Sequence, residues 1–191
     1  FLHTFTCSPP EMGLPGQEYF AGTHFNPQVT WWDMATGFIG YMNRCHAMLQ
    51  PGQFVADACY YYGDHVPNIA GRKEADPGGV LPHYDYDVID ETTLCERLAV
   101  ENGELTLPTG MRYKVLVLPD HRILSLAAIR AVRDLVEDGA VVVGPKPVRT
   151  ASLTAYPESE REIAALADAV WGEQPDEAGR HAFGKGRVFW T

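Results

Sequence analysis

The residues best suited to chemistry lie in one short stretch near the N-terminus. Glu18 precedes an aromatic and glycine-containing segment that includes His24 and Asn26 and ends with the adjacent tryptophans Trp31 and Trp32. Indole faces stack on the C–H face of a sugar ring, while short polar and acidic side chains hydrogen-bond its hydroxyls. These residue types favour a carbohydrate site. On composition alone, an ordinary turn before a helix, with both tryptophans in the core, is the more frequent arrangement.

A second group of polar residues follows an aromatic run farther along the chain. Asp64 and His65 come directly after Tyr60-Tyr61-Tyr62-Gly63, which ends a predicted strand. The carboxyl end of a central strand is the usual ligand position in an open α/β sheet. Asp64 and His65 could therefore contact a sugar or hold a metal ion. The alternative is an Asp/Gly turn whose aromatic neighbours pack at an interface.

Three further titratable residues alternate along the chain at His83, Asp85 and Asp87. Side chains at i, i+2 and i+4 of a strand share one face, so this set could bind a cation. A solvated acidic strand edge is the simpler interpretation, and we assign no metal ligands.

The N-terminal candidates require a loop followed by a helix. Residues 1 to about 26 are rich in Pro and Gly, which predicts a loop or broken strand. Asn26-Pro27 predicts an N-cap and a first helical residue for one long helix over residues 29–49, which Pro51-Gly52 ends. Its apolar residues recur at steps of three and four: Trp31, Met34, Phe38, Tyr41, Met42, Cys45, Met48 and Leu49.

From Phe54 onward, predicted strands alternate with helices. We expect strands over 54–61, 85–89, 113–118, 140–143 and 187–190, helices over 91–98, 125–138 and 158–171, and a hairpin turn at Asn102-Gly103. Such alternation favours an open, mostly parallel sheet with helices on both faces. We therefore predict an α/β fold with three layers, flavodoxin-like or class I amidotransferase-like, preceded by the loop and long helix.

Composition restricts the partners. The chain is 46% hydrophobic and 21% charged, as in ordered globular proteins. Its net charge of −10 argues against nucleic acid and against an anionic membrane surface. No run of eighteen apolar residues occurs, so no transmembrane segment is predicted. The four cysteines form no C-x-x-C pair, which favours structural thiols over zinc or redox chemistry. The cellular location stays open.

The α/β region lacks the motifs of common nucleophilic and nucleotide chemistry. The predicted strand 140–143 is followed by Gly144-Pro145-Lys146-Pro147, without the cysteine that an amidotransferase carries on its strand-to-helix elbow. No G-x-S-x-G motif occurs, and neither a P-loop nor a G-x-G-x-x-G follows the first strand. We expect this region to be non-catalytic.

Three segments resemble the large α-L-rhamnosidases of glycoside hydrolase family 106: Phe5–Trp32, Val55–Asn68 and Tyr113–Asp120. The resemblance extends to about Trp171. Enzymes of this family are several times longer, and their catalytic (β/α)8 barrel lies mainly N-terminal to the part that matches here. The resemblance therefore implies that residues 1–52 are the last part of a barrel and that residues 53–191 are the amidotransferase-like α/β domain behind it.

The same resemblance implies hydrolysis of a carbohydrate glycoside. That reaction needs two carboxyl groups, about 6.5–9.5 Å apart for inversion or about 5–5.5 Å for retention. Glu11 and Glu18 are the acids that precede the tryptophan pair. We favour Glu18 as catalytic because it immediately precedes the aromatic segment, with Glu11 as the alternative. His24 and Asn26 would hydrogen-bond sugar hydroxyls or a metal-bound water, and Ca²⁺ is a cofactor implied by the resemblance alone.

Two classes of function remain open. The chain is either part of a rhamnosidase-like glycosidase, weakly active or inactive by itself, or a non-catalytic α/β module for binding or oligomerisation. The long helix bears on both possibilities. We expect its apolar stripe to be buried, either against the α/β domain or against a second copy of the chain. Hydrolysis of a glycoside by the isolated chain would favour the first class, and an inert chain with a defined oligomeric state would favour the second.

Overall fold

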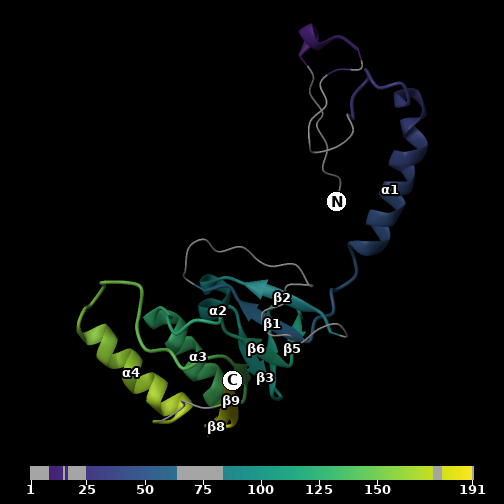
Figure 1. The fold of residues 1–191 in the computed structure, drawn as a ribbon. Helices are drawn as coiled ribbons and strands as arrows, with labels where there is room; N and C mark the ends of the chain where they lie inside the picture. Colours follow the sequence, from purple (N-terminus) through teal and green to yellow (C-terminus); the bar gives the residue numbers. More distant parts are fainter. Residues whose placement is uncertain (1–8, 15, 17–24, 64–83, 174–177, 191) are drawn as a thin grey trace. The chain divides into compact units, whose positions relative to one another are not determined.

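A computed structural model of the 191-residue chain describes residues 9–14, 16, 25–63, 84–173 and 178–190. The chain divides into two compact units, residues 1–53 (unit 1) and residues 54–191 (unit 2). Each unit is described by itself, with the elements labelled as in Figure 1.

The described part of unit 1 contains one α-helix and two short 3-10 turns. These elements are η1 (Pro10–Met12), η2 (Trp32–Met34) and α1 (Ala35–Leu49). The prediction that Asn26 caps a helix beginning at residue 29 was wrong. The Asn26 Oδ1 atom accepts a hydrogen bond from the backbone N–H of Gln28 at 2.8 Å, which closes a local turn. Bonds of the i→i+3 type follow, from Val29 to Asn26 and from Trp32 to Val29, so the α-helical pattern starts only at Ala35.

Unit 2 is built on a six-stranded sheet with the order β2-β1-β6-β7-β9-β8. Its strands are β1 (Ala58–Tyr61), β2 (Tyr86–Ile89), β6 (Val115–Val117), β7 (Val141–Val143), β8 (Gly179–Phe183) and β9 (Gly186–Trp190). All neighbouring pairs are parallel except β8 and β9. The predicted α/β class with a mostly parallel open sheet is confirmed. Strand β8 was missed, because its sequence is polar and it is defined by pairing with β9.

Three helices of unit 2 connect the strands: α2 (Glu91–Glu96), α3 (Leu126–Asp138) and α4 (Glu158–Trp171). Local capping sets their ends. Asp90 accepts a hydrogen bond from the backbone N–H of Thr93 at 2.8 Å, and Ser125 accepts one from Ala128 at 3.0 Å. Gly139 ends α3 at φ 126°, a conformation that side chains rarely adopt. The three predicted helices are confirmed.

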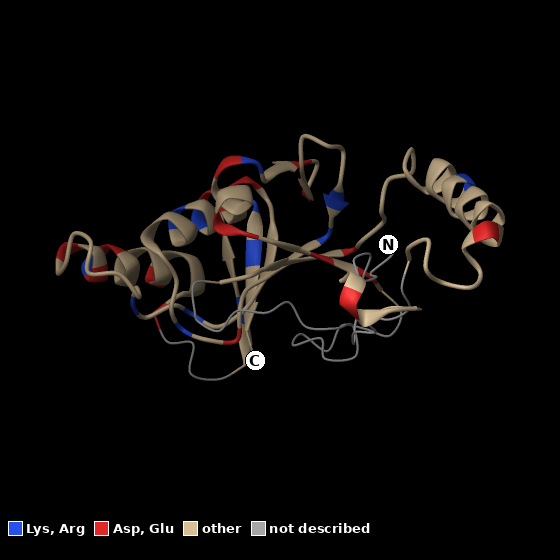
Figure 2. Ribbon diagram, turned by 90° about the horizontal axis from the view of Figure 1, so that it is seen from above, with Lys and Arg blue, Asp and Glu red and all other residues tan. Residues whose placement is uncertain are grey.

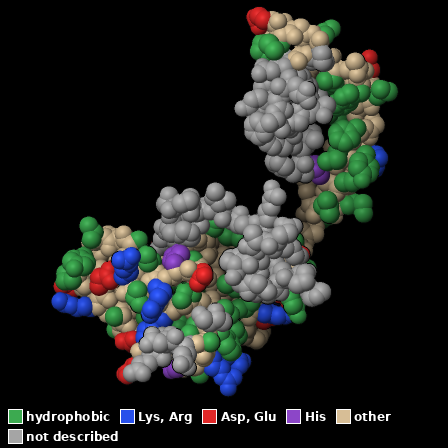
Figure 3. Space-filling view, viewed as in Figure 1, with side chains coloured by type: hydrophobic (Ala, Val, Ile, Leu, Met, Phe, Trp, Pro, Cys, Tyr) green, Lys and Arg blue, Asp and Glu red, His purple; other side chains and the backbone are tan. Residues whose placement is uncertain are grey.

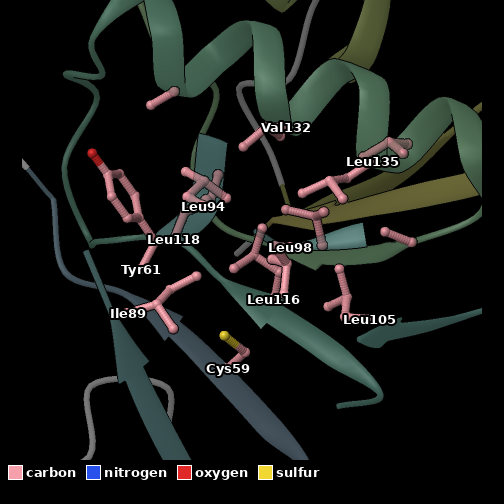
Figure 4. Packing of buried hydrophobic residues seen from close by; sticks show 14 of the residues in the cluster. Cys59, Tyr61, Ile89, Leu94, Leu98, Leu105, Leu116, Leu118, Val132 and Leu135 are labelled. Atoms are coloured by element: carbon pink, nitrogen blue, oxygen red, sulfur yellow. The ribbon is translucent and has the colours of Figure 1, made fainter. Parts of the chain in front are cut away.

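These helices share one face of the sheet. Register pairs define a row of residues across it: Asp87, Cys59, Leu116, Val142 and Val188. Except for Asp87, the core cluster joins this row to residues of all three helices, including Leu94, Val132 and Trp171. Figure 4 shows α3 over the strands, with Val132 and Leu135 directed towards the sheet.

The direction of the crossovers explains this common face. The connections through α2, α3 and α4 all advance towards the β8 edge, and right-handed crossovers in one direction place their helices on one side. A helical layer on the opposite face, expected from the alternating pattern, is not found in the described parts of unit 2.

A second, three-stranded antiparallel sheet contributes to the same core. It consists of β3 (Ala99–Glu101), β4 (Glu104–Thr106) and β5 (Arg112–Tyr113). The hairpin predicted at Asn102-Gly103 is confirmed, with φ values of 56° and 80°. The apolar run 113–118 was predicted as one strand but is divided between the two sheets. Tyr113 pairs with Leu105, whereas the N–H of Lys114 donates to the carbonyl of Asp57, next to β1, at 2.8 Å.

Candidate functional site

An aromatic cluster organises the described part of unit 1. The ring centroid of Phe25 lies 5.6 Å from that of Trp31, 5.4 Å from that of Trp32 and 6.3 Å from that of Phe38. Tilted and edge-on arrangements such as these are favoured between aromatic rings. Trp31 and Trp32 are only half-buried. The cluster therefore fixes both indoles while leaving part of their surface available to a ligand.

Asn26 lies in the turn that precedes the two tryptophans, and one of its side-chain groups has no hydrogen-bond partner among the described residues. The residue is 7% exposed, and its Oδ1 atom is used by the N–H of Gln28. Its Nδ2 atom, like the Oε1 atom of Gln28, is buried without a hydrogen-bond partner in the described structure. An unpaired buried donor costs about 1–3 kcal/mol. An oxygen-rich ligand would supply the acceptor that the amide nitrogen lacks.

The other predicted site residues fall into two groups. Glu11 lies on η1 and is exposed. Glu18, His24, Asp64 and His65 lie outside the described residues, so their assignment stays a prediction. The structure thus brings Trp31, Trp32 and Asn26 into one turn.

Two members of this aromatic cluster were not predicted as site residues. Phe25 links both indoles to Phe38 on α1. The sequence signal for them was weak, because Phe38 belongs to the helical apolar stripe and Phe25 is simply the neighbour of Asn26.

Cys59, on β1 of unit 2, is not an activated cysteine. Cys59 is fully buried, and burial, with a smaller contribution from the charge of Asp87, raises the pKa of its thiol to about 12. A thiol with that pKa is a poor nucleophile at neutral pH. Cys45, Cys59 and Cys95 are free cysteines. No group of three or more His, Cys, Asp or Glu residues in the described ranges is arranged to hold a metal ion.

The segment after β7 has a structural role instead of an elbow. Lys146 is 9% exposed, and its Nζ atom donates to the carboxylate of Asp168 and to the carbonyl of Gly172 at the end of α4. The indole N–H of Trp171 donates to the carbonyl of Gly144 at 3.0 Å. These bonds fasten the C-terminus of α4 to the sheet. Acidic and basic residues are interspersed along the helices of unit 2 (Figure 2).

The chain is similar to known glycoside hydrolases. The family model of the alpha-L-rhamnosidases, glycoside hydrolase family 106, matches residues 1–191. A protein of Formosa agariphila named "Putative beta-glucuronidase" is 36% identical over 177 residues, which is 90% of this chain and 14% of that protein. The solved structure of a rhamnosidase from Novosphingobium sp. PP1Y matches with a TM-score of 0.72 and 35% identity, over 89% of this chain and 16% of the other.

The chain belongs to glycoside hydrolase family 106, the alpha-L-rhamnosidases. It spans only 14% and 16% of the length of the two relatives described above. No helix in the described ranges is long and apolar enough to cross a membrane.

Proposed function

We propose that this chain forms part of a larger glycoside hydrolase that acts on α-L-rhamnosides, with unit 1 at the sugar site and unit 2 as a non-catalytic support. The observation that carries the proposal is the aromatic cluster beside the unpaired amide of Asn26, in a chain that matches the family along its whole length. Half-buried indoles provide a stacking surface, and the free amide N–H provides a donor for a hydroxyl.

The catalytic assignment within this proposal is Glu18, with Glu11 as the alternative. His24 completes the set of sugar contacts proposed in unit 1, and Asp64 and His65, which belong to unit 2, are separate candidates for contact with a sugar. In this arrangement the partner carboxylate belongs to the remainder of the enzyme. We therefore expect the 191-residue chain to bind sugar weakly and to turn over aryl glycosides at a rate near zero.

The properties of unit 2 support a structural role. Most of its largest buried side chains form one core between the sheet and the helices, and the segment after β7 fastens α4. Its buried Cys59 is not activated, since the pKa of that thiol is raised.

The second candidate function is assembly through α1. Several large apolar side chains of this helix are exposed, among them Tyr41 at 58%, Met48 at 80% and Leu49 at 73%. Figure 3 shows hydrophobic side chains gathered along this helix. A contiguous apolar surface of this kind is unusual on a monomer. Light scattering at low and high concentration tests this candidate, and a strictly monomeric chain would exclude self-association.

An activity assay with a matched pair of variants tests the glycosidase proposal. The chain is incubated with an aryl α-L-rhamnoside and, separately, with an aryl β-D-glucuronide. Any turnover should be confined to the rhamnoside and should disappear in Glu18→Gln, because loss of a general acid or base costs about 10²–10⁴-fold in rate. Glu158→Gln, on the exposed first turn of α4, is the control. Turnover that survives in Glu18→Gln would exclude Glu18 as a catalytic residue.

A further inference from the structure

Unit 2 contains a cavity that the proposed function does not use. Its volume is about 610 Å³, and it lies between the edge strand β2, helix α2 and the connection from β4 to β5. Asp87, Arg97 and Tyr113 contribute polar groups to its lining, and Leu107, Pro108 and Met111 contribute apolar ones. Sites for small molecules typically measure about 300–1,000 Å³ and combine apolar walls with a few placed polar groups.

Asp87 is an unusual residue for its position. It belongs to the row that faces the core, and its register partner Cys59 is 0% exposed. A carboxylate on the core side of a strand is costly unless it is hydrogen-bonded. The hydroxyl of Tyr113, a residue only 2% exposed, donates to its Oδ2 atom at 2.9 Å. The described residues provide no partner for the other oxygen, Oδ1, although Asp87 lines the cavity.

Tyr113 is held in its donating form. Burial, followed by the hydrogen bond to Asp87 and the charge of that carboxylate, raises the pKa of Tyr113. The phenol therefore stays protonated across the physiological range and keeps Oδ2 occupied. As a result, Asp87 offers a single oriented acceptor to whatever fills the cavity.

Arg97 provides the complementary donor. Its exposed side chain lines the cavity and forms no ion pair with any residue in the described ranges. The neighbouring Asp90 is already engaged in capping α2: hydrogen bonds from Thr93, with a smaller contribution from the charge of Arg97, lower the pKa of Asp90. The guanidinium is thus available to donate to a ligand oxygen.

We infer that this cavity binds a neutral polyol the size of one or two sugar rings. The Asp87 carboxylate would accept from one hydroxyl and Arg97 would donate to another, while Leu107, Pro108 and Met111 contact the C–H face. The carboxylates of Asp87 and Asp90, which both line the cavity, disfavour an anionic ligand. The guanidinium of Arg97 disfavours an amine. The inference goes beyond the proposed function, because these residues belong to unit 2 and none of them is in the aromatic cluster.

The test is an NMR titration of the ¹⁵N-labelled 191-residue chain with L-rhamnose, D-glucuronate and D-glucosamine. L-rhamnose should produce saturable shifts at Val88, Thr109 and Met111, with a Kd on the order of 1–10 mM. The two charged sugars should bind more weakly. Absence of saturable shifts at these residues would overturn the inference. Shifts confined to Trp31 and Trp32 would overturn it too, while leaving the proposed function intact.

Paired variants separate binding from fold stability. Arg97→Gln should weaken L-rhamnose binding about 5–10-fold, as expected for loss of one hydrogen bond from a charged donor. Arg161→Gln, exposed on α4, should leave the affinity unchanged. Asp87→Asn should weaken binding similarly.

An inward-facing charge on an edge strand can instead serve to prevent edge-to-edge aggregation. If Asp87 serves only that purpose, Asp87→Asn will aggregate and Arg97→Gln will bind normally, which would contradict the inference. Arg97→Gln decides the matter if Asp87→Asn does not fold.

Discussion

The two units place their apolar side chains in opposite ways. In unit 2, the central row of Cys59, Leu116, Val142 and Val188 is 0% exposed. In unit 1, α1 leaves Met34 at 72% and Met48 at 80% exposed, and the described buried residues of the unit are Asn26 and Ala35. A unit with its own core can hold its own fold, whereas one that exposes its apolar residues presents a surface for association. Stability therefore resides in unit 2, whereas the aromatic cluster and the exposed apolar face of α1, the surfaces proposed for the substrate and for assembly, belong to unit 1.

The largest expected effect is on the core of unit 2. Leu116→Ala removes a fully buried side chain from the centre of the sheet and should lower the free energy of unfolding by about 2–5 kcal/mol. Met48→Ala removes an apolar side chain of similar size from α1 and should change it by less than about 0.5 kcal/mol. Urea unfolding of both variants measures the contrast. Equal losses would show that α1 belongs to the stabilising core.

The pH dependence of unfolding also tests how completely the core of unit 2 is buried. The folded pKa of Cys59 is raised from 9.0 to about 12, so the thiolate is favoured in the unfolded chain. Its contribution to stability is complete below pH 9 and declines between pH 9 and about 12, by about 1.4 kcal/mol per pH unit. Tyr113, whose pKa is also raised, adds to the decline above its ordinary pKa of about 10.

The control for this experiment is Cys59→Ala. It lowers stability at neutral pH by leaving a small cavity, but it removes the thiol contribution. The gap between the variant and the parent in unfolding free energy should therefore narrow between pH 9 and 10. Parallel curves would mean that Cys59 ionises as readily in the folded state as in the unfolded state.

What the sequence could predict is largely what is local. The caps at Asp90 and Ser125, the Asn102-Gly103 hairpin and the span of α4 each depend on residues within a few positions of one another. The missed features depend on distant partners. The apolar run 113–118 divides because Tyr113 and Lys114 find partners in different parts of unit 2, and β8 exists only as the partner of β9.

The candidate sites follow the same rule. Trp31, Trp32 and Asn26 could be recognised from residue type alone, but the unpaired Nδ2 of Asn26 depends on burial. Asp87 was grouped with His83 and Asp85 as a cation site or a solvated edge. The structure instead joins Asp87 to Tyr113, 26 residues away, and no sequence pattern reports that contact. The usable signal was a charged residue on the core side of an otherwise apolar strand.

A small change in stability is also expected at Asn26, where a substitution separates function from fold most directly. Asn26→Ser keeps a short side-chain oxygen that can accept from the N–H of Gln28, so the turn should persist. The variant also removes the buried, unpaired Nδ2 donor. The loss of one interaction and the relief of the other should nearly cancel, leaving the free energy of unfolding within about 1 kcal/mol of the parent.

Sugar binding at the aromatic cluster should respond differently to Asn26→Ser. If Nδ2 donates to a sugar hydroxyl, the L-rhamnose shifts at Trp31 and Trp32 should weaken, while those at the unit 2 cavity stay unchanged. Gln28→Ala, which removes the other buried unpaired atom of this turn, tests whether any perturbation of the loop has the same effect. Equal weakening in both variants would indicate that loop packing, not the Asn26 amide, governs binding. An unchanged titration in Asn26→Ser would show that the Asn26 amide does not contact the sugar. Asn26 would then serve only to close the turn, the arrangement that composition alone favours.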